Sequence, residues 1–145
     1  MKNKFLIYIL MFISIIYFSS CKTDVKEKVN EKDFNLSETE NIDKIIMSDK
    51  AGNIIKLEKI KEKWTINSKY PVWDRQIEYT LDVMKDIRIK SSVSEQKTKF
   101  VLQNIATKGV KVEIFDGGQK IKSYYIGGNT SDHHGTYMIM ESAEN

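Results

Sequence analysis

The sequence predicts an α+β fold: an antiparallel β-rich domain made of two strand meanders separated by an amphipathic helix. Two segments, near Gly52 and Gly117, place alternating apolar residues on both sides of a glycine turn, as β-hairpins with one buried face do. Between them, apolar residues recur at spacings of three and four, which is typical of an amphipathic helix. A chain of 145 residues that is 41% hydrophobic suits one domain of ordinary core size.

The first meander is predicted in the segment "DKIIMSDKAGNIIKLEK". Two apolar runs flank residues 51–53, and Ile55 and Leu57 alternate with charged residues, so we expect a β-hairpin. After the charged turn "EKIKEK", the segment "WTIN" keeps the period of two through Trp64 and Ile66. A third strand is therefore predicted there.

A helix is predicted after Pro71, which cannot lie inside a central strand. Asp74 offers a carboxylate to the free amides of a helix that begins at Arg75 and ends near Arg88 or Ile89. One face of this helix is apolar, through Ile77, Leu81, Met84 and Ile87. The later segment "FVLQNIA" suggests a brief second helix.

The second meander begins with alternating apolar and charged residues at positions 110–114. The turn "DGGQ" supplies glycines that tolerate positive φ, "KIKSYYIGG" returns, and "TYMIMES" forms a last strand after the loop "GGNTSDHHG". We expect turn chemistry to explain the glycines of both "DGGQ" and "IGGNT". Gly52 and Gly117 lie at equivalent turns, and Trp64 and Tyr137 open equivalent strands, which resembles an internal duplication.

Residues 1–20 have the layout of an export signal. A charged start, "MKNK", precedes a fourteen-residue run from Phe5 to Phe18 that only Ser14 interrupts. Because roughly 20 apolar residues are needed to cross a bilayer, this run favours cleavage over a permanent membrane span. The apolar run ends at Cys21, the only cysteine in the chain, so no intramolecular disulfide can form.

The segment "FSSC" resembles the lipobox of bacterial lipoproteins, and its Phe and Ser variants resemble leaders from Bacteroidetes-type bacteria. The resemblance implies cleavage before Cys21 and attachment of a diacylglyceryl group to its thiol, with fatty acyl chains such as palmitate. Several acyl chains give stable anchoring to a membrane of the cell envelope. Lys22 does not decide between the inner and outer membrane or between leaflets. The alternative is an ordinary signal peptide followed by a chance free cysteine.

Residues 21–41 are predicted to form the acylated cysteine and a flexible charged tether. Half of residues 22–41 are charged, and the few larger apolar side chains bury too little to offset ordering entropy. The alternative is a short helix at "DVKEKVNEKD", whose apolar stripe is too thin to dock firmly. The β-rich domain then occupies residues 42–145.

The segments "IIKLEKIKEKWTINSKYPV" and "VKVEIFDGGQKIKSYYIGG", with the helix between them and the strand "GTYMIM", resemble the bacterial family domain of unknown function 4340. The resemblance covers roughly residues 42–140 and carries no active site. It implies an envelope location and an accessory role beside ABC transporters, near which members are often encoded. Members continue with further strands, so the end at "MESAEN" suggests a C-terminally truncated domain.

The charge argues against a nucleic-acid partner. Without Lys2 and Lys4 the chain has 21 basic and 20 acidic residues, and the lysines are interleaved with acids rather than clustered. We expect no cofactor and no metal. Asp132, His133 and His134 are the residues that could begin a metal or acid/base site, but adjacent histidines on an extended chain point in different directions.

The sequence contains no catalytic motif, so we expect no enzymatic activity. No GxSxG segment occurs, and no glycine-rich loop leads into a helix as a phosphate cradle requires. The large aromatic residues are predicted to lie in the core or on the sheet: Trp64, Trp73, Tyr79, Tyr124 and Tyr125. Strand alternation directs one of Tyr124 and Tyr125 outward, where it is a candidate binding contact.

Two functional hypotheses follow. The first is a non-enzymatic envelope lipoprotein whose domain binds a partner protein, with an ABC transporter complex as the candidate. The second is an envelope lipoprotein that binds or processes a small molecule or glycan through the 128–135 loop.

Overall fold

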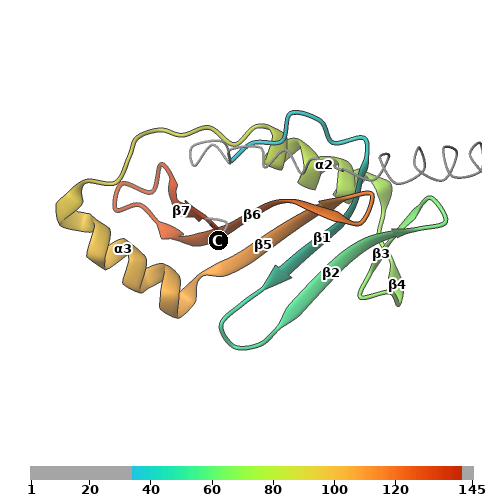
Figure 1. Ribbon diagram of the computed structural model, residues 1–145, viewed down its shortest axis with the longest axis horizontal. Coiled ribbons are helices and arrows are strands. Elements are labelled where there is room, and N and C mark those ends of the chain that lie inside the picture. The colour runs from blue at the N-terminus through green and yellow to red at the C-terminus, as the bar shows by residue number, and fades with distance from the viewer. Residues whose placement is uncertain (1–33, 142–145) are drawn as a thin grey trace, which may run out of the picture.

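The computed structural model describes residues 34–141, which form a seven-stranded antiparallel sheet with two helices between the strand groups (Figure 1). The predicted α+β class is confirmed. The strand order across the sheet is β4-β3-β2-β1-β5-β6-β7. Along the chain the elements are β1 (Ile42–Ser48), β2 (Ile54–Ile60), β3 (Lys63–Ile66), β4 (Tyr70–Pro71), α2 (Asp74–Lys85), α3 (Glu95–Lys108), β5 (Val110–Asp116), β6 (Gln119–Asn129) and β7 (Thr136–Met140).

The two predicted meanders meet at the centre of the sheet. β1 pairs with β5 in antiparallel register, with Ile45 opposite Ile114, and each meander then continues outward to its own edge. The short strand β4 forms one edge, which is where Pro71 costs no central ladder hydrogen bond. Strands β1–β3 and β5–β7 are thus arranged symmetrically about the β1–β5 pair, and β4 is an additional edge strand. An internal duplication would produce this symmetry, and the duplication stays a prediction.

The turn of the second hairpin confirms the role predicted for its glycines. Asp116 pairs with Gln119, so Gly117 and Gly118 form a two-residue connection, and their φ angles are 55° and 81°. Two positive φ angles are the signature of a type I′ turn, whose twist matches that of the flanking strands. Gly52, at φ 87°, serves the first hairpin.

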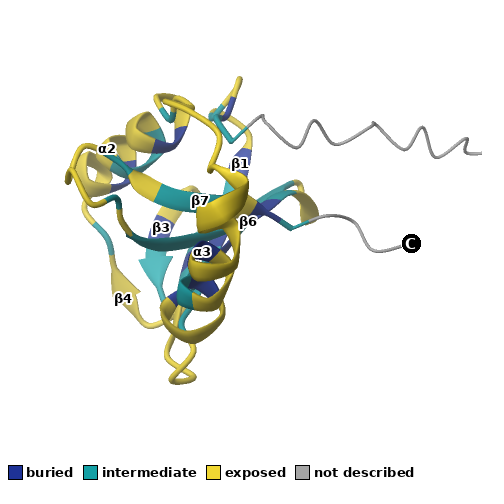
Figure 2. Ribbon diagram, turned by 90° about the vertical axis from the view of Figure 1, so that its left-hand side faces the viewer, coloured by how far each residue is buried: buried dark blue, intermediate teal, exposed yellow. Residues whose placement is uncertain are grey.

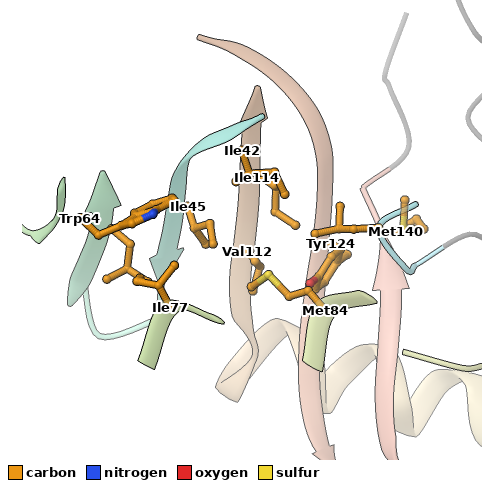
Figure 3. Close-up of a cluster of buried hydrophobic side chains, with 11 residues drawn as sticks. Ile42, Ile45, Trp64, Ile77, Met84, Val112, Ile114, Tyr124 and Met140 are labelled. Carbon is orange, nitrogen blue, oxygen red and sulfur yellow. The ribbon is translucent and has the colours of Figure 1, made fainter. Parts of the chain in front are cut away.

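The core lies between α2 and one face of the sheet (Figure 3). Ile77 and Met84 point from α2 toward side chains of the central strands. Ile45 and Ile114 are completely buried there. The alternating apolar residues of the strands therefore face the apolar stripe of the helix, as the sequence pattern predicts.

Helix α2 differs at both ends from the prediction. Trp73 is the N-cap residue, and Asp74 is the first helical residue with no side-chain capping hydrogen bond, so the predicted capping role is wrong. The carboxylate still lies in the first turn, where it complements the helix dipole. The helix ends at Lys85 rather than near residue 88, and the Arg88 guanidinium donates to the Lys85 carbonyl at 2.9 Å.

Helix α3 extends well beyond the brief helix predicted at residues 100–106. Its buried residues, Val101 and Ile105, face β6 and β7. The turn role predicted for Gly127 and Gly128 is wrong, because both lie within β6. A Cβ at Gly127 would come 2.7 Å from Cγ1 of Ile105, so this glycine permits close packing of the helix rather than a turn.

The folded domain begins earlier than residue 42. Leu36 is only 3% exposed, and its amide donates to the carbonyl of Met84 at 3.2 Å. The Phe34 ring packs edge to face on Tyr124 at a centroid distance of 6.0 Å. Residues 34–41, predicted to belong to the tether, are thus part of the packed domain, because Leu36 joins the core cluster and Phe34 packs against it.

Within residues 34–141, neither helix is both long enough and apolar enough to cross a bilayer. The predicted signal peptide, Cys21 and residues 22–33 lie outside the described residues.

Candidate functional site

A pocket of about 480 Å³ lies between the α2–α3 connection and the β6–β7 loop. In Figure 1 the connection runs past that loop on its way to α3. Apolar side chains from three parts of the chain contribute to the lining: Phe34, Ile87 and Met138. Hydroxyl groups and charged side chains complete it, so the pocket combines an apolar surface with a polar one.

The β6–β7 loop, residues 130–135, is closed by its own backbone. The Thr130 amide donates to the carbonyl of Gly135 at 2.8 Å, and the His133 amide donates to the carbonyl of Thr130 at 3.0 Å. His133 has a φ of 56°, a left-handed conformation that costs energy for a residue with a Cβ. The loop therefore has a defined shape.

Asp132 contacts groups of its own loop and of the α2–α3 connection. Its carboxylate accepts hydrogen bonds from the Thr130 hydroxyl and from the His134 amide. The Lys90 ammonium lies 3.1 Å from it and comes from the opposite wall. These three donors hold the pKa of Asp132 well below its usual range, with the Thr130 hydroxyl the largest contributor. Asp132 is consequently a paired carboxylate at neutral pH.

The structure separates the residues predicted as a site. Asp132 and His134 line the pocket, whereas His133 does not. Among residues 34–141 no three His, Cys, Asp or Glu side chains come together in a way that could hold a metal ion. The carboxylate of Asp132 already accepts hydrogen bonds from Thr130 and His134 and pairs with Lys90. Asp132 therefore stabilises the loop conformation.

The pocket contains three cationic side chains, which differ in what they contact. Arg88 donates to the carbonyls of Lys85 and Ile87 at 2.9 and 3.0 Å. Lys90 pairs with Asp132. Lys97, on the first turns of α3, has no ion-pair or hydrogen-bond partner for its ammonium among the described residues. Among the pocket cations, Lys97 is therefore the one that no group of residues 34–141 pairs with.

Sequence patterns did not identify the α2–α3 connection as a wall of this pocket. The only signal there is a polar run in which Lys90 and Lys97 flank Ser91, Ser92 and Ser94. Such a run is also typical of any exposed linker. Its proximity to a loop some 40 residues later depends on tertiary structure.

The tyrosine pair of β6 alternates as predicted. Tyr124 is 1% exposed in the core, and burial raises its pKa to about 12. Tyr125 points to the opposite face of the sheet, where its hydroxyl lies 3.4 Å from the Glu141 carboxylate. The ammonium of Lys50 lies 5.1 Å from the centre of its ring. Tyr125 is half-buried, and its hydroxyl and ring already contact Glu141 and Lys50. Less of this side chain is therefore open to a ligand than the sequence suggested.

A network of two lysines and two glutamates surrounds Tyr125. Lys111 contacts Glu141 at 2.7 Å and Glu113 at 3.2 Å, and Lys120 contacts Glu113 and Glu141 at 3.2 and 3.3 Å. The Lys111 ammonium is the main cause that lowers the pKa of Glu141 to about 2. Hydrogen bonding to Glu141 in turn raises the pKa of Lys111. The charged groups of this part of the sheet thus pair with one another.

Two of the large aromatic residues predicted for the core or sheet lie in solvent instead. Trp64 is buried at 8% exposure, but Trp73 and Tyr79 are 77% and 71% exposed. Tyr79 lies on the side of α2 opposite the buried Ile77, and Val83, four residues later, shares that side at 49% exposure. Figure 2 shows the outer side of α2 as exposed. We call Tyr79 and Val83, together with the exposed Trp73 at the N-cap of the same helix, the α2 aromatic surface.

No protein-family model, no curated protein and no solved structure matches the chain. The resemblance to domain of unknown function 4340 therefore stays a prediction, as does acylation of Cys21.

Proposed function

We propose that the chain is a membrane-anchored lipoprotein of the cell envelope, whose folded domain is a non-enzymatic accessory module that binds a partner protein through the α2 aromatic surface. The exposure of Trp73 and Tyr79 is the observation that carries this proposal. Tryptophan and tyrosine contribute much of the binding energy of protein interfaces. The core or sheet positions predicted for these two rings are not the ones they occupy, since both are exposed.

The position of the surface relative to the proposed anchor supports the proposal. The described chain begins beside α2, where the Leu36 amide donates to the Met84 carbonyl. Twelve residues, 22–33, separate Cys21 from Phe34 in the sequence, and a chain of that length spans at most roughly 45 Å. Acylation of Cys21 would therefore keep α2 within reach of proteins embedded in the same membrane.

The charge around α2 favours a protein over the lipid surface itself. Between residues 74 and 86 four acids stand against two bases: Asp74, Glu78, Asp82 and Asp86 against Arg75 and Lys85. Anionic headgroups attract lysine and arginine and repel such a segment. We infer a partner that offers an apolar pocket with basic residues around it. An ABC transporter complex is the candidate that the predicted family resemblance suggests.

Site-specific crosslinking tests this proposal in the full-length lipoprotein. A photoreactive phenylalanine analogue replaces Tyr79, and the crosslinked products from native membranes are identified by mass spectrometry. The matched control places the same group at Phe100, which is 64% exposed on α3. We expect one envelope protein to be captured from position 79 and not from position 100.

Two further variants define the contradicting result. The product at position 79 should fall at least about fivefold with Trp73→Ala, because an interface aromatic contributes about 1 kcal/mol or more. It should also disappear with Cys21→Ala, which removes the anchor. Equal capture from positions 79 and 100, or a product unaffected by Trp73→Ala, would contradict the proposed interface.

A further inference from the structure

We propose that the pocket between the α2–α3 connection and the β6–β7 loop binds a small anionic molecule that also has an apolar body. None of the residues of the α2 aromatic surface lines this pocket, so a ligand and the proposed partner would bind at separate sites. The ligand class follows from the size of the pocket, the distribution of its apolar groups and the one pocket cation that no group of residues 34–141 pairs with.

The size and lining are those of a small-molecule site. Ligand pockets typically measure about 300–1,000 Å³ and combine apolar walls with a few polar groups, and this pocket measures about 480 Å³. Phe34 and Met138 lie on the side of the pocket that packs against the core. The apolar body of a ligand would lie on these two side chains.

The charge of the pocket selects the sign of the ligand. Arg88, Lys90 and Lys97 contribute three positive charges, and Asp132 contributes one negative charge. The Lys90 ammonium pairs with Asp132, and the Arg88 guanidinium lies 3.7 Å from the Asp86 carboxylate, so each of these two cations has a counter-charge. Lys97 remains without a counter-charge among the described residues, and an anionic group on the ligand would supply it.

The lining also offers polar groups to the anionic end of the ligand. The Lys90–Asp132 contact of 3.1 Å joins the two walls, and the loop that carries Asp132 is closed on itself through Thr130 and Gly135. Hydroxyl groups of Ser92, Ser94 and Thr136 lie around the pocket and offer hydrogen bonds to a carboxylate, sulfonate or phosphate.

A pair of fluorescent probes tests both parts of the proposal on the purified acylated protein. The anion 8-anilinonaphthalene-1-sulfonate carries a sulfonate on an aromatic body, and N-phenyl-1-naphthylamine has the same body without the charge. We expect the sulfonate probe to bind more tightly, with chemical-shift changes at the amides of residues 88–97 and 130–138.

Charge reversal at Lys97 identifies the recognising group. Lys97→Glu should weaken the sulfonate probe about tenfold and change the affinity of the uncharged probe less than twofold. Lys99→Glu is the matched control, since it makes the same charge change on the same helix outside the pocket. Equal effects of the two variants, equal binding of the two probes, or shifts confined to other residues would overturn the proposal.

Discussion

Leu36 is the residue whose position changes the domain boundary most. It lies in a charged segment, yet its side chain is 3% exposed and completes the core beside α2. We expect Leu36→Ala to lower the free energy of unfolding by about 2–4 kcal/mol, because the substitution leaves a cavity that the neighbouring residues fill only in part. Chemical denaturation of the purified domain measures this.

Leu102→Ala is the matched control for Leu36→Ala, since Leu102 is 45% exposed on α3. Its cost should stay below about 0.5 kcal/mol. Equal costs for the two substitutions would show that residues 34–41 are not packed on the domain.

Glu141 should make stability depend on pH in a defined window. Its pKa falls from 4.5 to about 2 on folding, chiefly through the Lys111 ammonium. Because the folded-state pKa is the lower one, the carboxylate stabilises the fold above about 4.5 and loses that contribution as the pH falls to about 2. We expect Glu141→Gln to cost about 1–2 kcal/mol at pH 7 after solvent screening, and close to nothing at pH 2.

Unfolding curves recorded from pH 7 to pH 2 measure this difference. Glu78→Gln is the control, because Glu78 forms no ion pair among the described residues and lies on α2. A difference between the wild type and Glu141→Gln that stays constant with pH would contradict the assigned role of Lys111.

At the scale of elements, the β2–β3 turn carries strain that can be relieved. Ile60 pairs with Lys63, so Lys61 and Glu62 form a two-residue connection, and both have positive φ, at 48° and 64°. Asn-Gly is the preferred sequence for such a type I′ turn. We expect the double substitution Lys61→Asn and Glu62→Gly to raise the free energy of unfolding by about 1 kcal/mol.

The double substitution also removes the ion pair between Lys59 and Glu62, but this pair is exposed and contributes little. Thermal denaturation measures the gain. A lower melting temperature would show that the turn does not adopt these angles in solution.

The contact of α3 with β6 depends on Gly127. A methyl group at this position would meet Ile105 at 2.7 Å, so we expect Gly127→Ala to cost about 1–3 kcal/mol by overpacking. Amides of α3 should exchange faster with solvent, since α3 would dock less closely.

Gly135→Ala is the control for Gly127→Ala, because a methyl group there would lie 3.6 Å from the nearest atom. Its effect should be well below that of Gly127→Ala. If Gly127→Ala leaves both stability and exchange unchanged, α3 does not pack on β6 as described.

At the scale of the whole molecule, most of the sheet was predictable because its signals are local. Apolar and polar residues alternate along each strand, and the turn at Gly117 requires a positive φ angle. Both signals involve only a few neighbouring residues. The helix stripe through Ile77 and Met84 also acts locally and predicted the buried face of α2.

What could not be predicted depends on contacts between distant segments. Leu36 becomes a core residue only through its packing in one cluster with side chains of α2 and the sheet. The exposure of Trp73 and Tyr79 follows from which side of α2 meets the sheet, whereas composition alone favours burial. The sequence identified two residues that line the pocket, Asp132 and His134. It did not identify Lys97, because only the tertiary fold brings α3 to the β6–β7 loop.

Acylation of Cys21 is the central prediction, because it would place the domain at a membrane. The direct measurement is the intact mass and N-terminal sequence of the protein purified from its native membranes. We predict a chain that begins at Cys21 and carries the added mass of a diacylglyceryl group and its acyl chains. A chain that retains residues 1–20, or begins at Cys21 without added lipid mass, would contradict it.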